Sequence, residues 1–271
     1  MSEPAQAGKT CDLRGIREAV CVHTGKITDS CLAKDCIEDL RVYLTVDSQH
    51  TLDCAASAKA RFVELLFVDV QVECVPYSSG YFTVDVTFYY RVIADATLSA
   101  GRTNTVTGLA VFSKRLVLFG GETCARIFSS KDDLTCLCKK SLQSVSLPRA
   151  IAETVDPIIL GSRVMEACGC CCQSETAPSI PEALLGCFDE PLVLTGECKR
   201  LLVTIGQFSI VRLERDTQLL IPTFDYCVPS KTCPPVGGTS TESPCEVFSQ
   251  IDFPMDAFFP GKNEPCIKPE D

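Results

Sequence analysis

The residues in this sequence that are best suited to chemistry are cysteines, of which the 271-residue chain has 19. Four of them crowd one short segment, as Cys168, Cys170, Cys171 and Cys172. Thiolates bind zinc, copper(I) or iron–sulfur clusters, and thiols also form disulfides. Neighbouring cysteines rarely pair with one another, because the small ring strains the intervening peptide. The segment therefore offers a metal site, a set of cross-links to other cysteines, or thiols that stay free.

The spacing of the cysteines favours cross-links over metal. Familiar zinc sites use two Cys-x-x-Cys pairs, whereas Cys168-x-x-Cys171 has no second pair and Cys187 and Cys198 follow singly. An odd number of cysteines also means that pairing within one chain cannot use every thiol. We therefore expect a covalently linked assembly of subunits, and no cofactor. The candidate cross-linking residues are Cys168, Cys170, Cys171, Cys172, Cys136, Cys138, Cys233, Cys245 and Cys266.

The sequence gives little support for catalysis. It has two histidines, His23 and His50, and none of the common nucleophile, zinc-protease or phosphate-binding motifs. Cys21 lies two residues from His23, which is weak evidence for a Cys–His pair. A redox enzyme would need one thiol of depressed pKa, and no basic surroundings single one out. We expect no enzymatic activity, and thiolate metal binding stays open as the alternative function.

Charge and hydropathy restrict the partners. The formal net charge is −10, which argues against nucleic acid and anionic membrane surfaces, because both bind basic patches. No run of about 18 uncharged apolar residues is present, so no membrane span is expected. Residues 1–10 are polar and small, without the apolar stretch of a signal peptide. We expect synthesis in a cytosol, with the thiols reduced at first and oxidised later.

The elements that must position these cysteines are mainly strands. Hydrophobic residues alternate over 66–74 and 82–90, on either side of a turn near Gly80, which predicts a long antiparallel hairpin with one buried face. Cys74 lies on the apolar face of its strand, so we expect it in the core. Further strands are expected at 40–46, 105–112, 116–119, 124–128, 202–205, 208–213 and 218–221.

Helices are expected to be short and few. Asp29 or Ser30 is suited to cap a helix over 31–38. Pro148 is expected to open a helical turn. A second helix is expected over 158–167, directly before the cluster of four cysteines.

We expect a mainly β fold with an antiparallel, sandwich-like core. After a disordered tail over 1–10, residues 11–130 would form its first strand-rich part, and 199–226 would add the strands that complete it. A cysteine-rich insertion of short helices and loops would occupy 131–198.

The last segment, 227–271, holds half of the chain's 16 prolines and cannot be a long helix or a central strand. We expect an extended arm that docks its phenylalanines on a groove: Phe248, Phe253, Phe258 and Phe259.

Five stretches of the sequence carry a family resemblance: 29–45, 80–85, 108–120, 155–161 and 206–222. They resemble cysteine-rich structural proteins of the clostridial spore coat and exosporium, and the likeness spans about residues 29–260. It implies a structural protein that assembles with itself, and with other spore-surface proteins, into an ordered layer cross-linked by disulfides. It also implies synthesis in the mother-cell cytosol without a signal peptide, followed by oxidation of the thiols at the spore surface.

Overall fold

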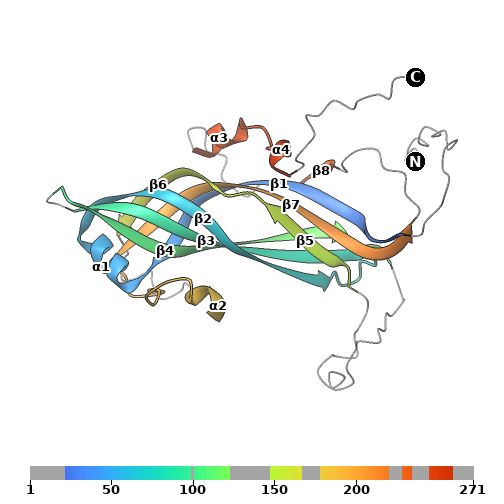
Figure 1. Ribbon diagram of the computed structural model, residues 1–271, viewed down its shortest axis with the longest axis horizontal. Coiled ribbons are helices and arrows are strands. Elements are labelled where there is room, and N and C mark those ends of the chain that lie inside the picture. Colours follow the sequence, from blue (N-terminus) through green and yellow to red (C-terminus); the bar gives the residue numbers. More distant parts are fainter. Residues whose placement is uncertain are drawn as a thin grey trace, which may run out of the picture.

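The computed structural model of this protein describes residues 22–98, 101–122, 147–166, 178–219, 228–233 and 244–258. Within these residues eight strands form one sheet (Figure 1): β1 (Val22–Leu44), β2 (Ala55–Cys74), β3 (Tyr81–Leu98), β4 (Thr103–Phe119), β5 (Arg149–Thr154), β6 (Ile158–Glu166), β7 (Lys199–Leu219) and β8 (Lys231–Thr232). Short helices flank the sheet: α1 (Val46–Cys54), α2 (Glu182–Leu185), α3 (Pro244–Ser249) and α4 (Met255–Phe258). The expectation of a mainly β, antiparallel core with few short helices is confirmed.

The sheet is rolled so that its two outer edges approach each other. The strand order is β2-β3-β4-β1-β7-β5, β6 follows β5 along the same edge of β7, and all of these pairs are antiparallel. Where the edges meet, the backbone N–H of Ala60 in β2 donates a hydrogen bond of 2.9 Å to Oγ of Ser162 in β6. One continuous, nearly closed sheet therefore surrounds the core, and its strands run along the long axis of the molecule (Figure 1).

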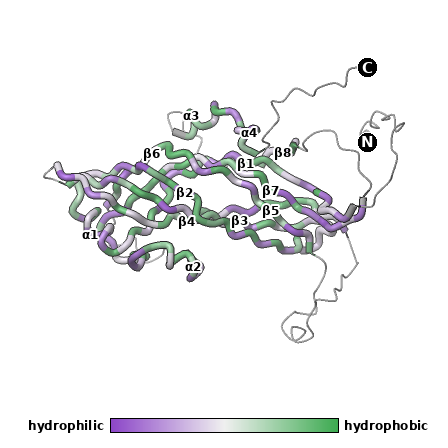
Figure 2. Tube along the Cα trace, viewed as in Figure 1, coloured by the Kyte–Doolittle hydropathy of each residue, from purple (hydrophilic) through white to green (hydrophobic). Residues whose placement is uncertain are grey.

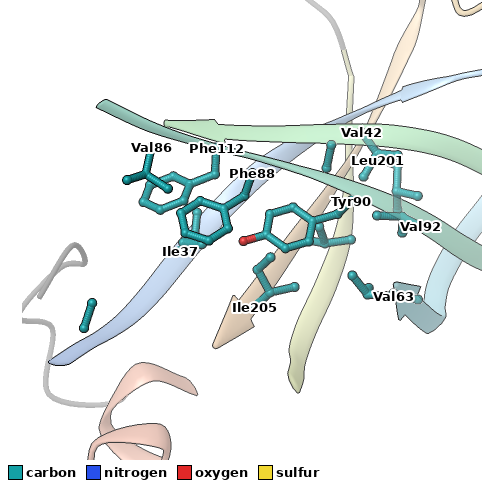
Figure 3. Close-up of a cluster of buried hydrophobic side chains, with 14 of the residues drawn as sticks. Ile37, Val42, Val63, Val86, Phe88, Tyr90, Val92, Phe112, Leu201 and Ile205 are labelled. Carbon is teal, nitrogen blue, oxygen red and sulfur yellow. The ribbon is translucent and has the colours of Figure 1, made fainter. Parts of the chain in front are cut away.

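The core lies inside the rolled sheet, and the predicted hairpin is confirmed as β2 paired with β3. Alternate residues of β3 from Phe82 to Tyr90 are at most 5% exposed. Figure 3 shows Val86, Phe88 and Tyr90 in one cluster with Ile205 of β7. Figure 2 shows hydrophobic and hydrophilic residues mixed along each strand. Because successive side chains of a strand point to opposite faces, this alternation buries one face and leaves the other to solvent.

The helix predicted over 31–38 is wrong, because these residues lie within β1. β1 pairs with β7 without interruption from Cys31 to Ile37. Both faces of β1 are covered here, since Cys31 and Ala33 belong to the main core while Cys36 lies in a second cluster. Apolar residues therefore fall on both sides of the strand, and the alternation that identifies a strand disappears.

The helical turn predicted after Pro148 and the helix predicted over 158–167 are also wrong. β5 begins at Arg149, and β6 covers Ile158–Glu166. Both pair with β7 and satisfy the backbone groups along its outer edge. The insertion predicted over 131–198 thus contributes two strands to the sheet, and within its described residues only α2 is helical.

β7 is one long strand rather than the separate runs predicted over 202–205, 208–213 and 218–221. Gly206 lies within it, and a Cβ at this position would lie 2.5 Å from the ring of Phe248. The glycine therefore permits close packing within a continuous strand. The runs 105–112 and 116–119 likewise join in β4.

Two predictions fall outside the described residues, namely the tail over 1–10 and the strand over 124–128. In the ranges that the structure describes, no helix is long and apolar enough to cross a membrane.

Candidate cross-linking sites

Two disulfides attach the C-terminal segment to β1. Cys31 is bonded to Cys233 and Cys36 to Cys245, with Cα–Cα distances of 5.8 and 5.6 Å. The paired cysteines are 202 and 209 residues apart in the sequence. Beside the first disulfide, β8 pairs in parallel with β1, and the backbone N–H of Cys233 donates a 2.7 Å hydrogen bond to the carbonyl of Leu32. The two ends of the described chain are therefore joined covalently.

The two disulfides lie on opposite faces of the sheet. Cys31 and Cys36 are five residues apart in an uninterrupted stretch of β1, and residues an odd number apart on a strand point to opposite faces. Cys31 belongs to the main core, whereas Cys36 lies in a separate cluster outside it. The C-terminal segment reaches both faces because β4 pairs with β1 only at Val42–Leu44, which leaves the β1 edge near Cys31 open for β8.

The outer cluster is aromatic. Phe248 of α3 is 1% exposed, and its ring centroid lies 4.8 Å from that of Phe208 on β7. Phe253 packs on the same ring at 5.3 Å. Nζ of Lys34 donates hydrogen bonds of 2.9 and 2.7 Å to two backbone carbonyls at and just after the end of α3. The predicted docking is therefore observed for Phe248, Phe253 and Phe258, and Phe259 lies outside the described residues. The arm is not wholly extended, because it includes α3 and α4.

Four cysteines of the described residues are free and exposed: Cys54, Cys74, Cys187 and Cys198. Cys54 ends α1 directly before β2, and Cys74 ends β2. The strand between them is roughly 60 Å long at about 3.3 Å per residue. Cys198 lies at the same end as Cys54, because the backbone N–H of Lys199 donates a 3.0 Å hydrogen bond to Oδ1 of Asp53. Free thiols are thus present at both ends of the long axis of the molecule.

The prediction that Cys74 is a core residue is wrong, because β2 reaches the open end of the sheet before its last side chain is covered. Cys74 lines a pocket of about 500 Å³ together with Tyr81 and Arg215. The guanidinium of Arg215 lies 5.6 Å from the ring centroid of Phe82. Burial lowers the pKa of Arg215, and the nearby Cys74 opposes that shift. The pocket therefore combines an accessible thiol, a positive charge and aromatic walls.

The predicted cross-linking residues fall into two groups. Cys233 and Cys245 form the intrachain disulfides, so these two are used within the subunit. The others lie outside the described residues: Cys136, Cys138, Cys168, Cys170, Cys171, Cys172 and Cys266. The sequence alone does not reveal the partners Cys31 and Cys36, since their odd spacing becomes informative only once the segment is recognised as a strand.

Within the part of the chain that the structure describes, no group of three or more His, Cys, Asp or Glu side chains is placed to hold a metal ion. Comparison with protein-family models, with curated proteins and with solved structures finds no match to this chain. What the described thiols can do chemically is form disulfides, within the subunit for the buried pairs and with another molecule for the exposed ones.

Proposed function

We propose that this protein is a structural subunit that assembles with itself into an ordered layer of the bacterial spore surface, in the coat or the exosporium, and that disulfides between subunits lock the layer. The setting at the spore surface rests on the resemblance of the five sequence stretches to clostridial spore proteins. The self-assembly and its cross-links rest on the arrangement of the thiols.

The observation that carries the proposal is the separation of the exposed thiols. Cys54 and Cys198 lie at one end of the rolled sheet, and Cys74 lies at the other, roughly 60 Å away by strand length. Two thiols so far apart cannot bond to each other within one molecule, because a disulfide needs Cα atoms within about 7 Å. Each can bond to a second subunit. A contact between unlike ends repeats from subunit to subunit and builds closed rings or open filaments, which lateral contacts would join into a layer.

The intrachain disulfides complement this arrangement. Cys31–Cys233 and Cys36–Cys245 fix the C-terminal segment to both faces of β1. A subunit whose shape is fixed in this way presents its end thiols at constant positions, which a repeating layer requires. Oxidation after assembly would close the intrachain and the intersubunit disulfides together, and so preserve a geometry that non-covalent contacts had set.

The experiment is electron microscopy of the purified protein before and after a reductant, combined with peptide mapping of the oxidised assembly. We expect ordered rings, filaments or sheets that weaken in the reductant, with linked peptides that join Cys74 of one subunit to Cys54 or Cys198 of another. The variant Cys74→Ser should lose these linked peptides and much of the detergent resistance. The variant Cys187→Ser is the matched control, since it removes an exposed thiol that is not at the end of β2.

Small monodisperse particles under both conditions would refute self-assembly. Ordered arrays without linked peptides at Cys74 would instead refute the end-to-end cross-link. Immunogold labelling of released, intact spores checks the setting, and an unlabelled spore surface would contradict it.

A further inference from the structure

A buried pair of opposite charges lies inside the rolled sheet and has no part in the proposed cross-links. Asp35 of β1 and Lys114 of β4 both point into the core, and their side chains are 1% and 4% exposed. Nζ of Lys114 contacts Oδ2 of Asp35 directly. The two residues are 79 positions apart in the sequence. Neither fits the alternating apolar pattern of its strand, and burial of each charged side chain costs free energy.

The surroundings of the pair are aromatic and nearly dry. Nζ of Lys114 lies 5.8 Å from the ring centroid of Phe88, which stacks on Tyr90 with a centroid distance of 6.2 Å. Figure 3 shows these two rings among aliphatic side chains, with the hydroxyl oxygen of Tyr90 directed into the cluster. Oγ of Ser209 accepts a hydrogen bond of 3.4 Å from Nζ of Lys114. The amine is therefore held beside the carboxyl group by few polar contacts.

As an ion pair, Asp35 and Lys114 have too few hydrogen bonds to offset the free-energy cost of removing both charges from water. Oδ1 of Asp35 has no hydrogen-bond partner among the described residues, and neither has the hydroxyl of Tyr90. A buried ion pair is maintained at low cost only when its remaining donors and acceptors are satisfied. Burial lowers the pKa of Lys114, although Asp35 opposes the shift. The neutral amine, which is the nucleophilic form of lysine, is therefore more accessible to Lys114 than to a lysine exposed to solvent.

We infer that Lys114 and Asp35 condense to an intramolecular amide between Nζ and Cγ. A proton passes from the ammonium to the carboxylate, and the neutral amine attacks Cγ to form the C–N bond. A second proton then passes from the nitrogen to the hydroxyl group, which leaves as water when its C–O bond breaks. The products are the amide and one water molecule, so the reaction needs no oxidant, reductant or co-reactant. Reactants held in contact behave as if at very high concentration, and exclusion of water from the core protects the amide from hydrolysis.

The position of the bond gives it a structural role. The backbone ladder between β1 and β4 covers only Val42–Leu44 of β1. An amide between Asp35 and Lys114 would join the strands covalently in the stretch where they separate. It would also persist in reductant, unlike the disulfides. The inference does not depend on the proposed function.

The test is the intact mass of the full chain after complete reduction and denaturation. We expect a mass lower than the sequence mass by one water molecule. Trypsin should then release the peptide Asp35–Arg41 joined to Thr103–Arg115, because an acylated Lys114 is not cleaved. The full sequence mass would overturn the inference, and so would loss of water without the joined peptides.

Three variants sharpen the result. Lys114→Arg keeps the positive charge but removes the amine, so the loss of water should disappear. Asp35→Asn should release ammonia in place of water and give the same final mass as the wild-type product. Arg115→Lys places an amine on the exposed face of β4, near Asp85 of the neighbouring strand β3, where Arg115 now binds that carboxylate at 2.6 and 2.8 Å. No second loss of water is expected there, because the site is open to solvent. If the Lys114 or Asp35 variants fail to fold, the wild-type peptides alone decide.

Discussion

Removal of the two disulfides of the C-terminal segment should reveal a strong energetic coupling between them. The variants replace Cys36 and Cys245 by alanine, Cys31 and Cys233 by alanine, or all four together. Alanine suits these sites because all four side chains are at most 9% exposed and lie in apolar clusters. With alanine at these sites, the measured effect comes mainly from the conformational entropy that each disulfide removes from the unfolded chain.

The magnitude follows from the loops that the disulfides close. While Cys31–Cys233 is intact, Cys36–Cys245 closes a circuit of only about 17 residues, because the pairs are five and twelve positions apart on the two segments. Loop-closure entropy gives about 3 kcal/mol for such a circuit. A single remaining disulfide closes more than 200 residues, which the same relation makes about 5 kcal/mol. Loss of both should therefore cost about 8 kcal/mol, against about 3 kcal/mol for either alone.

Urea unfolding at equilibrium measures these free energies. The chain has no tryptophan and six tyrosines, so far-ultraviolet circular dichroism and tyrosine fluorescence are the two probes. The exposed thiols are alkylated first under native conditions, which prevents exchange with the remaining disulfide. A cost for the quadruple variant equal to the sum of the two double variants would refute the nested-loop reasoning.

Three further outcomes are expected. Gly206→Val should destabilise the protein by about 1–3 kcal/mol and speed proteolysis of the C-terminal segment, since its side chain would overlap the ring of Phe248; unchanged proteolysis would contradict the close packing. Burial raises the pKa of Tyr90 well above its ordinary value of 10.0. Above about pH 10 the folded state therefore keeps the Tyr90 proton that the unfolded chain loses. The free energy of unfolding is unaffected by this group below about pH 10, and above it declines by up to about 1.4 kcal/mol per pH unit. Urea midpoints of Tyr90→Phe should decline less steeply in this range than those of the wild type, and equal slopes would contradict the burial of an ionisable hydroxyl. Finally, a maleimide should label Cys74 in the native protein and leave Cys31 unlabelled, which mass mapping of the labelled peptides checks; equal labelling would contradict the assigned disulfide.

Part of the fold is predictable from local pattern alone. The alternation over 82–90 places Phe82, Val84, Val86, Phe88 and Tyr90 on one face, and all five are buried in the structure. The adjacent run over 66–74 and the short turn predicted its antiparallel partner, which is β2. Such a hairpin depends on residues close in sequence, so the information that specifies it is available within a few dozen positions.

Other assignments failed because the deciding contacts are distant in sequence. The segment 31–38 is a strand because it pairs with β7, which lies near the other end of the chain. β5 and β6 are strands for the same reason, since each of them also pairs with β7. In β1, coverage of both faces removes the periodicity that would have identified the strand, and intrinsic preference is too weak to oppose a tertiary partner.

The sequence by itself determined a β-rich chain, an abundance of thiols and the absence of common catalytic motifs, because composition and local alternation are properties of neighbouring residues. Only the tertiary structure decided which cysteines pair and which stay exposed. It also decided that Asp35 meets Lys114 in the core. These outcomes depend on which strands lie side by side, and that choice is made by burial of the whole sheet around one core rather than by any single segment.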